Sequence, residues 1–166
     1  EARLMSKLIH PNIVQLFNLI EIKGNMILVM EYVEGKDLDQ IIGKDMGPMP
    51  YETALPIFMQ VLQGVGHAHA GGIIHRDIKP GNVMVSKRHI AKVNDFGVAK
   101  LIGQEGLTKV GTQVGTVFYM SPEQVIGTDI DHRSDIYSLG VTLYEMLAGR
   151  LPYDDHTSNE FKIQNM

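Results

Sequence analysis

The residues with the clearest chemical potential lie in one short run, His-Arg-Asp-Ile-Lys-Pro-Gly-Asn at positions 75–82. The run places Asp77, Lys79 and Asn82 on a single loop between two apolar stretches. Phosphoryl transfer needs an aspartate that can take a proton, a lysine beside the transferring phosphoryl group and oxygen ligands for Mg²⁺. The residue types and their spacing therefore indicate a site that could support phosphoryl transfer.

Two further motifs follow this loop. Asp95-Phe96-Gly97 begins thirteen residues after Asn82, and Ser121-Pro122-Glu123 comes later in the chain. In this order the three motifs resemble the H-R-D-x-x-x-x-N, D-F-G and A-P-E motifs of protein kinases, with serine in place of the alanine. Lys79, two residues after the aspartate, resembles the serine/threonine class. Residues 75–82 and 115–124 look closest to bacterial kinases of the eukaryotic type.

The resemblance implies a role for each polar residue of the motifs. Asp77 would orient and deprotonate the attacking hydroxyl, Lys79 would neutralise charge on the γ-phosphate of ATP, and Thr116 would contact both. Asn82 and Asp95 would ligate Mg²⁺, which Mn²⁺ could replace. On its own, an Asp-x-Lys pair is more often a surface salt bridge and an asparagine is often a turn residue. The flanking motifs favour the catalytic interpretation.

The nucleotide contacts implied by the resemblance involve the following positions: backbone groups of Glu31 to Val33 for adenine, Asp37 for the ribose, and Met84 beneath the base. Met30 would be the gatekeeper. Glu1, ten residues before Pro11, stands where the family has the helix glutamate that pairs with the ATP-binding lysine. Without the resemblance, the apolar members of this set would be ordinary core residues.

Regulation is implied in the same way. Arg76, beside the catalytic aspartate, would bind a phosphate on the activation segment 95–123 through charge-assisted hydrogen bonds. Thr108 and Thr112 are the candidate phosphosites. A regulatory stack of side chains would join the two lobes of the kinase fold. Its members would be Met5, Leu16, His75 and Phe96.

Two acidic residues have predicted structural roles. Asp135 precedes an apolar helix, so it would cap that helix. The resemblance implies that its carboxylate holds the backbone around His75 and Arg76, and both roles are compatible. Glu123 pairs with a later arginine in whole kinases, and we expect it to lack that partner here.

Hydrophobic periodicity and turn residues predict the elements that position these groups. They are the end of a helix over 1–9, strands over 13–20 and 26–32, a short helix over 37–42, a helix over 51–70, a hairpin over 83–93 and a helix over 134–148. Residues 98–120 lack sustained periodicity and are predicted to form a mobile loop. Pro56 is expected in a first turn or at a kink.

The two long helices have predicted core stripes. The stripe of the first is Leu55, Phe58, Leu62, Val65 and His69, and that of the second is Ile136, Leu139, Gly140, Leu143 and Leu147. Two histidines, His67 and His69, are spaced i, i+2 and would point away from each other on a helix, so a shared zinc site is not expected.

The predicted fold class is therefore α+β, a protein-kinase-like two-lobe fold with a partial small lobe over 1–33 and a partial large lobe over 34–166. The family's glycine-rich loop and V-A-I-K lysine do not occur in the sequence. We expect these 166 residues to be part of a longer chain, and to be weakly active or inactive alone.

Amino-acid composition limits the kinds of binding partner that we expect for this chain. The formal net charge is −4, which argues against a nucleic-acid surface. The chain contains no cysteine, which excludes disulfides and thiolate metal sites. No apolar run reaches the ~18 residues of a membrane helix. We expect ATP and protein substrates, no membrane contact from this segment, a kinase dimer through autophosphorylation, and a cytoplasmic location or a cytoplasmic domain of a membrane-tethered protein.

Two alternatives remain open at this point. One is a pseudokinase or truncated scaffold that acts as an interaction module, against which intact Asp77, Lys79, Asn82 and Asp95 argue. The other is a small-molecule kinase of related fold, against which Lys79 and the Ser121-Pro122-Glu123 segment argue.

Overall fold

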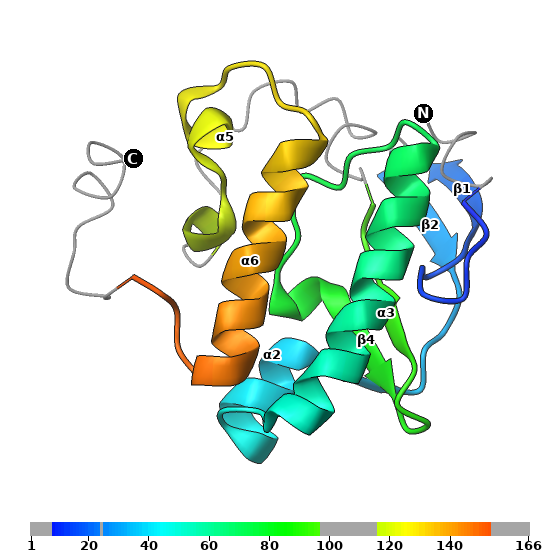
Figure 1. Cartoon of the computed structure of the whole chain (residues 1–166). Coiled ribbons are helices and arrows are strands. Elements are labelled where there is room, and N and C mark those ends of the chain that lie inside the picture. The colour runs from blue at the N-terminus through cyan, green and yellow to red at the C-terminus, as the bar shows by residue number, and fades with distance from the viewer. Residues whose placement is uncertain (1–7, 24, 97–115, 154–166) are drawn as a thin grey trace.

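The computed structural model describes residues 8–23, 25–96 and 116–153. Two long helices, α3 (Tyr51–Ala70) and α6 (His132–Ala148), dominate it and pack against each other. In Figure 1, α3 separates α6 from the two-stranded sheet of β1 (Leu16–Ile22) and β2 (Asn25–Met30). A second sheet packs on α3 and contains the hairpin that follows the 75–82 loop.

The antiparallel pair β1–β2 differs from the predicted strands over 13–20 and 26–32. Pairing begins at Leu16↔Met30 and ends at Ile22↔Asn25, and Lys23 turns the chain with φ of 50°. Residues 12–14 do not belong to this strand pair, because Ile13 forms an isolated parallel bridge with Val93 instead. The strand boundaries predicted from the apolar run were therefore wrong at both ends.

The second sheet has the order β3–β4–β5, all antiparallel, with β3 Gly35–Asp37, β4 Val83–Ser86 and β5 Ala91–Val93. The predicted hairpin over 83–93 is confirmed. Strand β3 was not predicted, because its residues are polar and only its pairing with β4 makes it a strand. A side chain at Gly35 would lie 2.1 Å from the carbonyl oxygen of Val85, so this close pairing requires glycine.

Helix α2 (Leu38–Gln40) continues as a π-helical segment, Ile41–Met46, which makes this element longer than the predicted helix over 37–42. Two shorter pieces border the site: a 3₁₀ turn over Pro80–Asn82 and helix α5 (Pro122–Ile126), which begins with a capping box at Ser121. Thr116–Tyr119 forms a further 3₁₀ turn, so the end of the predicted loop 98–120 is ordered. The rest of that loop lies outside the described residues.

The bounds predicted for α3 are confirmed, and its buried face was partly predicted, since Phe58 and Val65 are buried. Leu55 and Leu62 are 36% and 37% exposed, while smaller residues face the core, namely Ala54, Ile57, Val61, Gly64 and Ala68. At Gly64 the helix approaches the Asn12 backbone so closely that a side chain there would not fit. Pro56 lies in the second turn of α3 rather than the first.

Helix α6 begins two residues earlier than predicted, because Asp131 is its N-cap and accepts a hydrogen bond from the Arg133 N–H at 2.8 Å. Gly149 ends it in the left-handed conformation, with φ of 67°. The predicted apolar stripe was partly wrong: Ile136 is 56% exposed and the buried face is largely polar. Its buried polar members are Ser134, Asp135, Ser138 and Thr142.

The core joins α3 to the β4–β5 hairpin through Phe58, Val61, Val83 and Val93. Across residues 8–23, 25–96 and 116–153, we find no helix with the length and apolar character needed to cross a bilayer. The predicted helix end over 1–9 lies almost wholly outside the described residues, and a boundary between lobes at residue 33 stays a prediction.

Candidate active site

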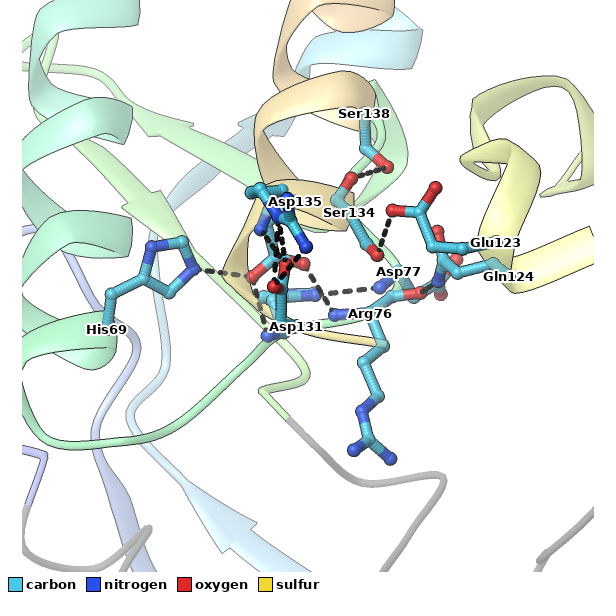
Figure 2. Close-up of polar contacts among 11 residues, drawn as sticks. His69, Arg76, Asp77, Glu123, Gln124, Asp131, Ser134, Asp135 and Ser138 are labelled. Atoms are coloured by element: carbon cyan, nitrogen blue, oxygen red, sulfur yellow. Dashed lines mark hydrogen bonds and ion pairs between the residues drawn. The ribbon is translucent and has the colours of Figure 1, made fainter. Parts of the chain in front are cut away.

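The loop after α3 is held in place by one buried carboxylate from α6. Asp135 is fully buried; its Oδ2 accepts the His75 backbone N–H and its Oδ1 accepts that of Arg76, both at 2.8 Å. His69 of α3 adds a third contact, with its Nε2 2.7 Å from Asp135 Oδ2. Figure 2 shows His69 and the loop backbone converging on this carboxylate. Asp135 is thus not the helix cap, since Asp131 takes that place.

Arg76 is fixed by its backbone rather than by its side chain. Its φ is 70°, a conformation that is uncommon for a residue with a side chain, and its carbonyl oxygen accepts a 2.7 Å hydrogen bond from Gln124 Nε2. In Figure 2 the guanidinium points away from this network. Hydrogen bonds at its N–H and at its carbonyl therefore hold the strained backbone of Arg76, whereas its guanidinium lies outside the hydrogen-bond cluster.

His75 links the loop to the strand that carries Asp95. Its Nδ1 accepts the Asp77 backbone N–H at 3.2 Å, so its Nε2 carries the proton and donates to the Asn94 carbonyl at 2.7 Å. Burial lowers the pKa of His75, although Asp135 acts in the opposite direction. The neutral imidazole packs edge-on against Phe96, with ring centroids 4.6 Å apart.

The three polar residues of the loop form one cluster. Lys79 Nζ lies 2.9 Å from Asp77 Oδ2 and 3.1 Å from Asp77 Oδ1. Asn82 Nδ2 donates to the same Oδ2 at 3.0 Å and to the Asp77 carbonyl at 2.7 Å. The Asp77 carboxylate is thus oriented by a cation and an amide, and its side chain remains 39% exposed. An aspartate in this setting can approach a hydroxyl group and accept its proton.

Asp95 is brought beside this cluster by the hairpin. The Asn94 N–H donates to the Asn82 carbonyl at 2.9 Å, which continues the β4–β5 ladder to the residue before Asp95. Although Asp95 as a residue is exposed, desolvation by the surrounding protein raises the pKa of its carboxyl. Lys79 lowers that pKa and Asp77 raises it. The Asn94–Asn82 hydrogen bond therefore places Asp95 next to the loop that carries Asp77 and Asn82.

The donor set fits Mg²⁺. Both hydrogens of the Asn82 amide are directed at Asp77, which leaves its Oδ1 as the atom that can ligate a cation beside the Asp95 carboxylate. The described ranges contain no group of three or more His, Asp or Glu side chains that could hold a metal by themselves. Two hard oxygen ligands completed by phosphate oxygens and water are typical of Mg²⁺ in phosphoryl-transfer sites.

The predicted nucleotide contacts lie near the two sheets. Glu31 follows β2, and its N–H donates to the Gln15 carbonyl at 2.8 Å while its carboxylate pairs with Lys92 at 2.9 Å. Asp37 and Met84 lie directly opposite each other across β3 and β4. Asp37 also caps α2, because its Oδ1 accepts the Gln40 N–H at 2.7 Å. Val33 is half-buried.

An apolar pocket lies next to Asp95 and is lined by Leu8, Ile13, Leu16, Leu28, Met30 and Phe96. It brings Leu16 of the predicted stack close to Phe96, which in turn contacts His75. Met5, the fourth member of that stack, lies outside the described residues, as do Glu1, Thr108 and Thr112. Thr116 begins the 3₁₀ turn Thr116–Tyr119.

Glu123 binds α6, because Ser134 Oγ donates to its Oε1, and this hydrogen bond lowers the pKa of the Glu123 carboxyl. Within the described residues, Ser134 and not an arginine is therefore its hydrogen-bonding partner. Helix α6 holds the preceding turn as well: Ser138 Oγ donates to the Tyr119 carbonyl at 2.7 Å, and the Tyr119 hydroxyl donates to Glu145 at 2.6 Å.

Comparison with known proteins decides the family. The protein kinase domain family matches residues 1–166. The chain belongs to the protein kinase family. This confirms the resemblance and the expected kinase fold.

Bacterial relatives named as serine/threonine-protein kinases match the chain over nearly its whole length. The probable serine/threonine-protein kinase PknB of Lactococcus lactis is 42% identical over 154 residues, which cover 93% of this chain and 24% of that protein. Serine/threonine-protein kinase PrkC of Bacillus subtilis is 39% identical over 166 residues, covering 100% and 26%. Serine/threonine-protein kinase pkn2 of Myxococcus xanthus is 42% identical over 171 residues, covering 99% and 20%. The chain therefore spans between 20% and 26% of these relatives' length.

Several residues that build this kinase site were not predicted. His69 was considered as a member of the α3 core stripe and as an unlikely metal ligand, yet it binds Asp135. Gln124 and Ser138 support Arg76 and the Tyr119 turn from a distance in sequence. The only sequence signal for Ser138 was a polar residue at a core-spaced position of α6, which would have suggested a polar helix face against the site.

Proposed function

We propose that this chain carries the catalytic core of a serine/threonine protein kinase, which transfers the γ-phosphate of ATP to serine and threonine hydroxyls of proteins. The observation that carries the proposal is the Asp77 carboxylate held between Lys79 and Asn82, with Asp95 beside them. The names of the relatives support the substrate class.

In the proposed reaction the substrate hydroxyl oxygen attacks the γ-phosphorus, the bond to the β–γ bridging oxygen breaks, and ADP leaves with that electron pair. Asp77 orients the hydroxyl and accepts its proton, while Lys79 stabilises the charge on the phosphoryl oxygens. Positioning and electrostatics supply most of the rate enhancement, because the transition state is loose. Thr116 is proposed to contact Asp77 and Lys79.

Asn82 Oδ1 and the Asp95 carboxylate would hold Mg²⁺, with Mn²⁺ as an alternative. A divalent cation bound there neutralises charge on the phosphate oxygens. The adenine would bond to the backbone of Glu31 to Val33 and lie over Met84, with Asp37 at the ribose. Since Asp37 caps α2 through Oδ1, its second oxygen is the one available to a ribose hydroxyl. Glu1 would pair with the family's ATP-binding lysine.

Regulation is proposed to act through Arg76. Its guanidinium points away from the catalytic hydrogen bonds, which supports a role in binding a phosphate on Thr108 or Thr112. Transfer between two copies of the kinase would place that phosphate.

The test uses the full-length protein that contains these residues, incubated with Mg²⁺, ATP labelled at the γ-phosphate and a general protein substrate. We expect label on serine and threonine, and mass spectrometry should locate autophosphorylation at Thr108 or Thr112. Asp95→Asn should lower transfer on the order of 10²-fold or more, since it removes a charged metal ligand.

The matched control is Asp45→Asn, which neutralises an exposed aspartate on the π-helical segment. It should leave transfer unchanged. A folded wild-type protein that transfers no phosphate would overturn the proposal and favour a pseudokinase acting as an interaction module.

A further inference from the structure

A segment before β1 closes the outer edge of β5. The Val93 N–H donates to the Asn12 carbonyl, and the Val14 N–H donates to the Val93 carbonyl, both at 2.9 Å. Strand β5 is only three residues long and forms the edge of the β3–β4–β5 sheet. It ends one residue before Asn94 and two before Asp95. Its position therefore determines where the proposed metal ligand lies.

Two side-chain amides complete this edge at Ala91, the first residue of β5. Asn12 Nδ2 donates to the Ala91 carbonyl at 2.9 Å and to Gln60 Oε1 at 3.1 Å. Gln60 Oε1 also accepts the Ala91 N–H at 3.0 Å, and Gln60 Nε2 donates to the His89 carbonyl at 3.1 Å. Gln60 belongs to α3, so the amide pair joins three segments that are distant in sequence.

Asn12 is enclosed by the protein, and Gln60 is half-buried beside it. Asn12 is 4% exposed, and a Cβ at Gly64 of α3 would lie 2.6 Å from the Asn12 carbonyl oxygen. Hydrogen-bonded amides in an enclosed place favour one geometry, because a shift would leave polar groups unpaired. Strand β5 is thus held at a defined position along the axis of α3.

The rest of the site is held by a different element. The loop with Asp77 and Asn82 is anchored to α6 through Asp135, whereas Asp95 follows a strand anchored to α3 through Gln60 and Asn12. The relative position of the two proposed metal ligands then depends on both anchors and on the Asn94–Asn82 hydrogen bond that joins the two segments.

We infer that Asn12 and Gln60 are positioning residues of the metal site, which set the place of Asp95 relative to Asn82 and Asp77. The inference rests on the proposed function. Breaking the amide pair should therefore weaken metal binding, although neither Asn12 nor Gln60 is proposed to contact the metal, the nucleotide or the protein substrate.

The test compares Asn12→Ala and Gln60→Leu with the control Gln63→Leu, which changes an exposed glutamine on the same helix. In the full-length protein, we expect the Mg²⁺ concentration for half-maximal transfer at saturating ATP to rise about tenfold in both variants, as for outer-shell residues of metal sites. KM for the protein substrate should stay unchanged. Gln60→Glu keeps the acceptor for Asn12 and Ala91, so its effect should be smaller.

Calorimetric binding of ADP with Mg²⁺ gives a readout that needs no transfer, and melting curves ensure that each variant is measured while folded. A wild-type protein that binds but does not transfer would refute the proposed function while the binding ratio still tests the positioning role. Unchanged Mg²⁺ dependence and unchanged binding in Asn12→Ala and Gln60→Leu would overturn the inference, even if both variants melt earlier. Absence of binding by the wild type would refute both.

Discussion

Replacing Asp77 with asparagine should lower kcat for phosphate transfer by about 10³-fold, within the range that a general base contributes. Asparagine has nearly the same shape, and its oxygen can still accept hydrogen bonds from Asn82 and Lys79. It cannot accept the proton of the attacking hydroxyl. The KM for ATP should change little, because Asp77 is proposed to act on the hydroxyl and not on the nucleotide.

The measurement is steady-state transfer by the full-length protein at saturating ATP and Mg²⁺, with a melting curve for each variant. Asp129→Asn is the matched control, since Asp129 is exposed and lies beyond α5. Asp77→Asn with wild-type kcat would show that another group accepts the proton, and the assigned role would be wrong.

The second large effect is expected on stability. Asp135→Ala should reduce the free energy of unfolding by about 3–5 kcal/mol, because two backbone N–H groups and the His69 ring would lose their acceptor. This is a large share of the ~5–15 kcal/mol that stabilises an ordinary domain. The catalytic loop would lose its anchor as well, so transfer should fall together with stability.

Urea unfolding of the full-length protein, followed by circular dichroism, measures this change. Asp131→Asn on the same helix serves as the control; asparagine caps helices as well as aspartate does, so stability should change far less. If Asp135→Ala unfolded at the same urea concentration as wild type, the carboxylate would not be the anchor described above.

The cluster of Asp77, Lys79 and Asn82 was predictable from the sequence, because the three residues lie within six positions of one another. The bounds of α3 and the β4–β5 hairpin also followed from local patterns of apolar and turn residues. These features depend on neighbours in the chain, which a sequence displays directly.

The supports of the site could not be predicted in this way. His69 and Asp135 are 66 positions apart, and Asn12 and Ala91 are 79 apart. Their partners are chosen by packing, not by spacing. The buried face of α3 was only partly predicted for a related reason: Gly64 faces the core because the Asn12 backbone comes close, which hydrophobicity alone does not reveal.

The proposed phosphoryl transfer requires that Asn82 and Asp95 bind one metal ion beside Asp77. Crystals of the full-length protein or its kinase region with a non-hydrolysable ATP analogue and Mg²⁺, repeated with Mn²⁺ to locate the metal by anomalous scattering, test this directly. We predict a metal bound to phosphate oxygens, to Asp95 and to Asn82 Oδ1, with metal–oxygen distances of about 2.1 Å for Mg²⁺. A nucleotide-bound metal that touches neither side chain would contradict it.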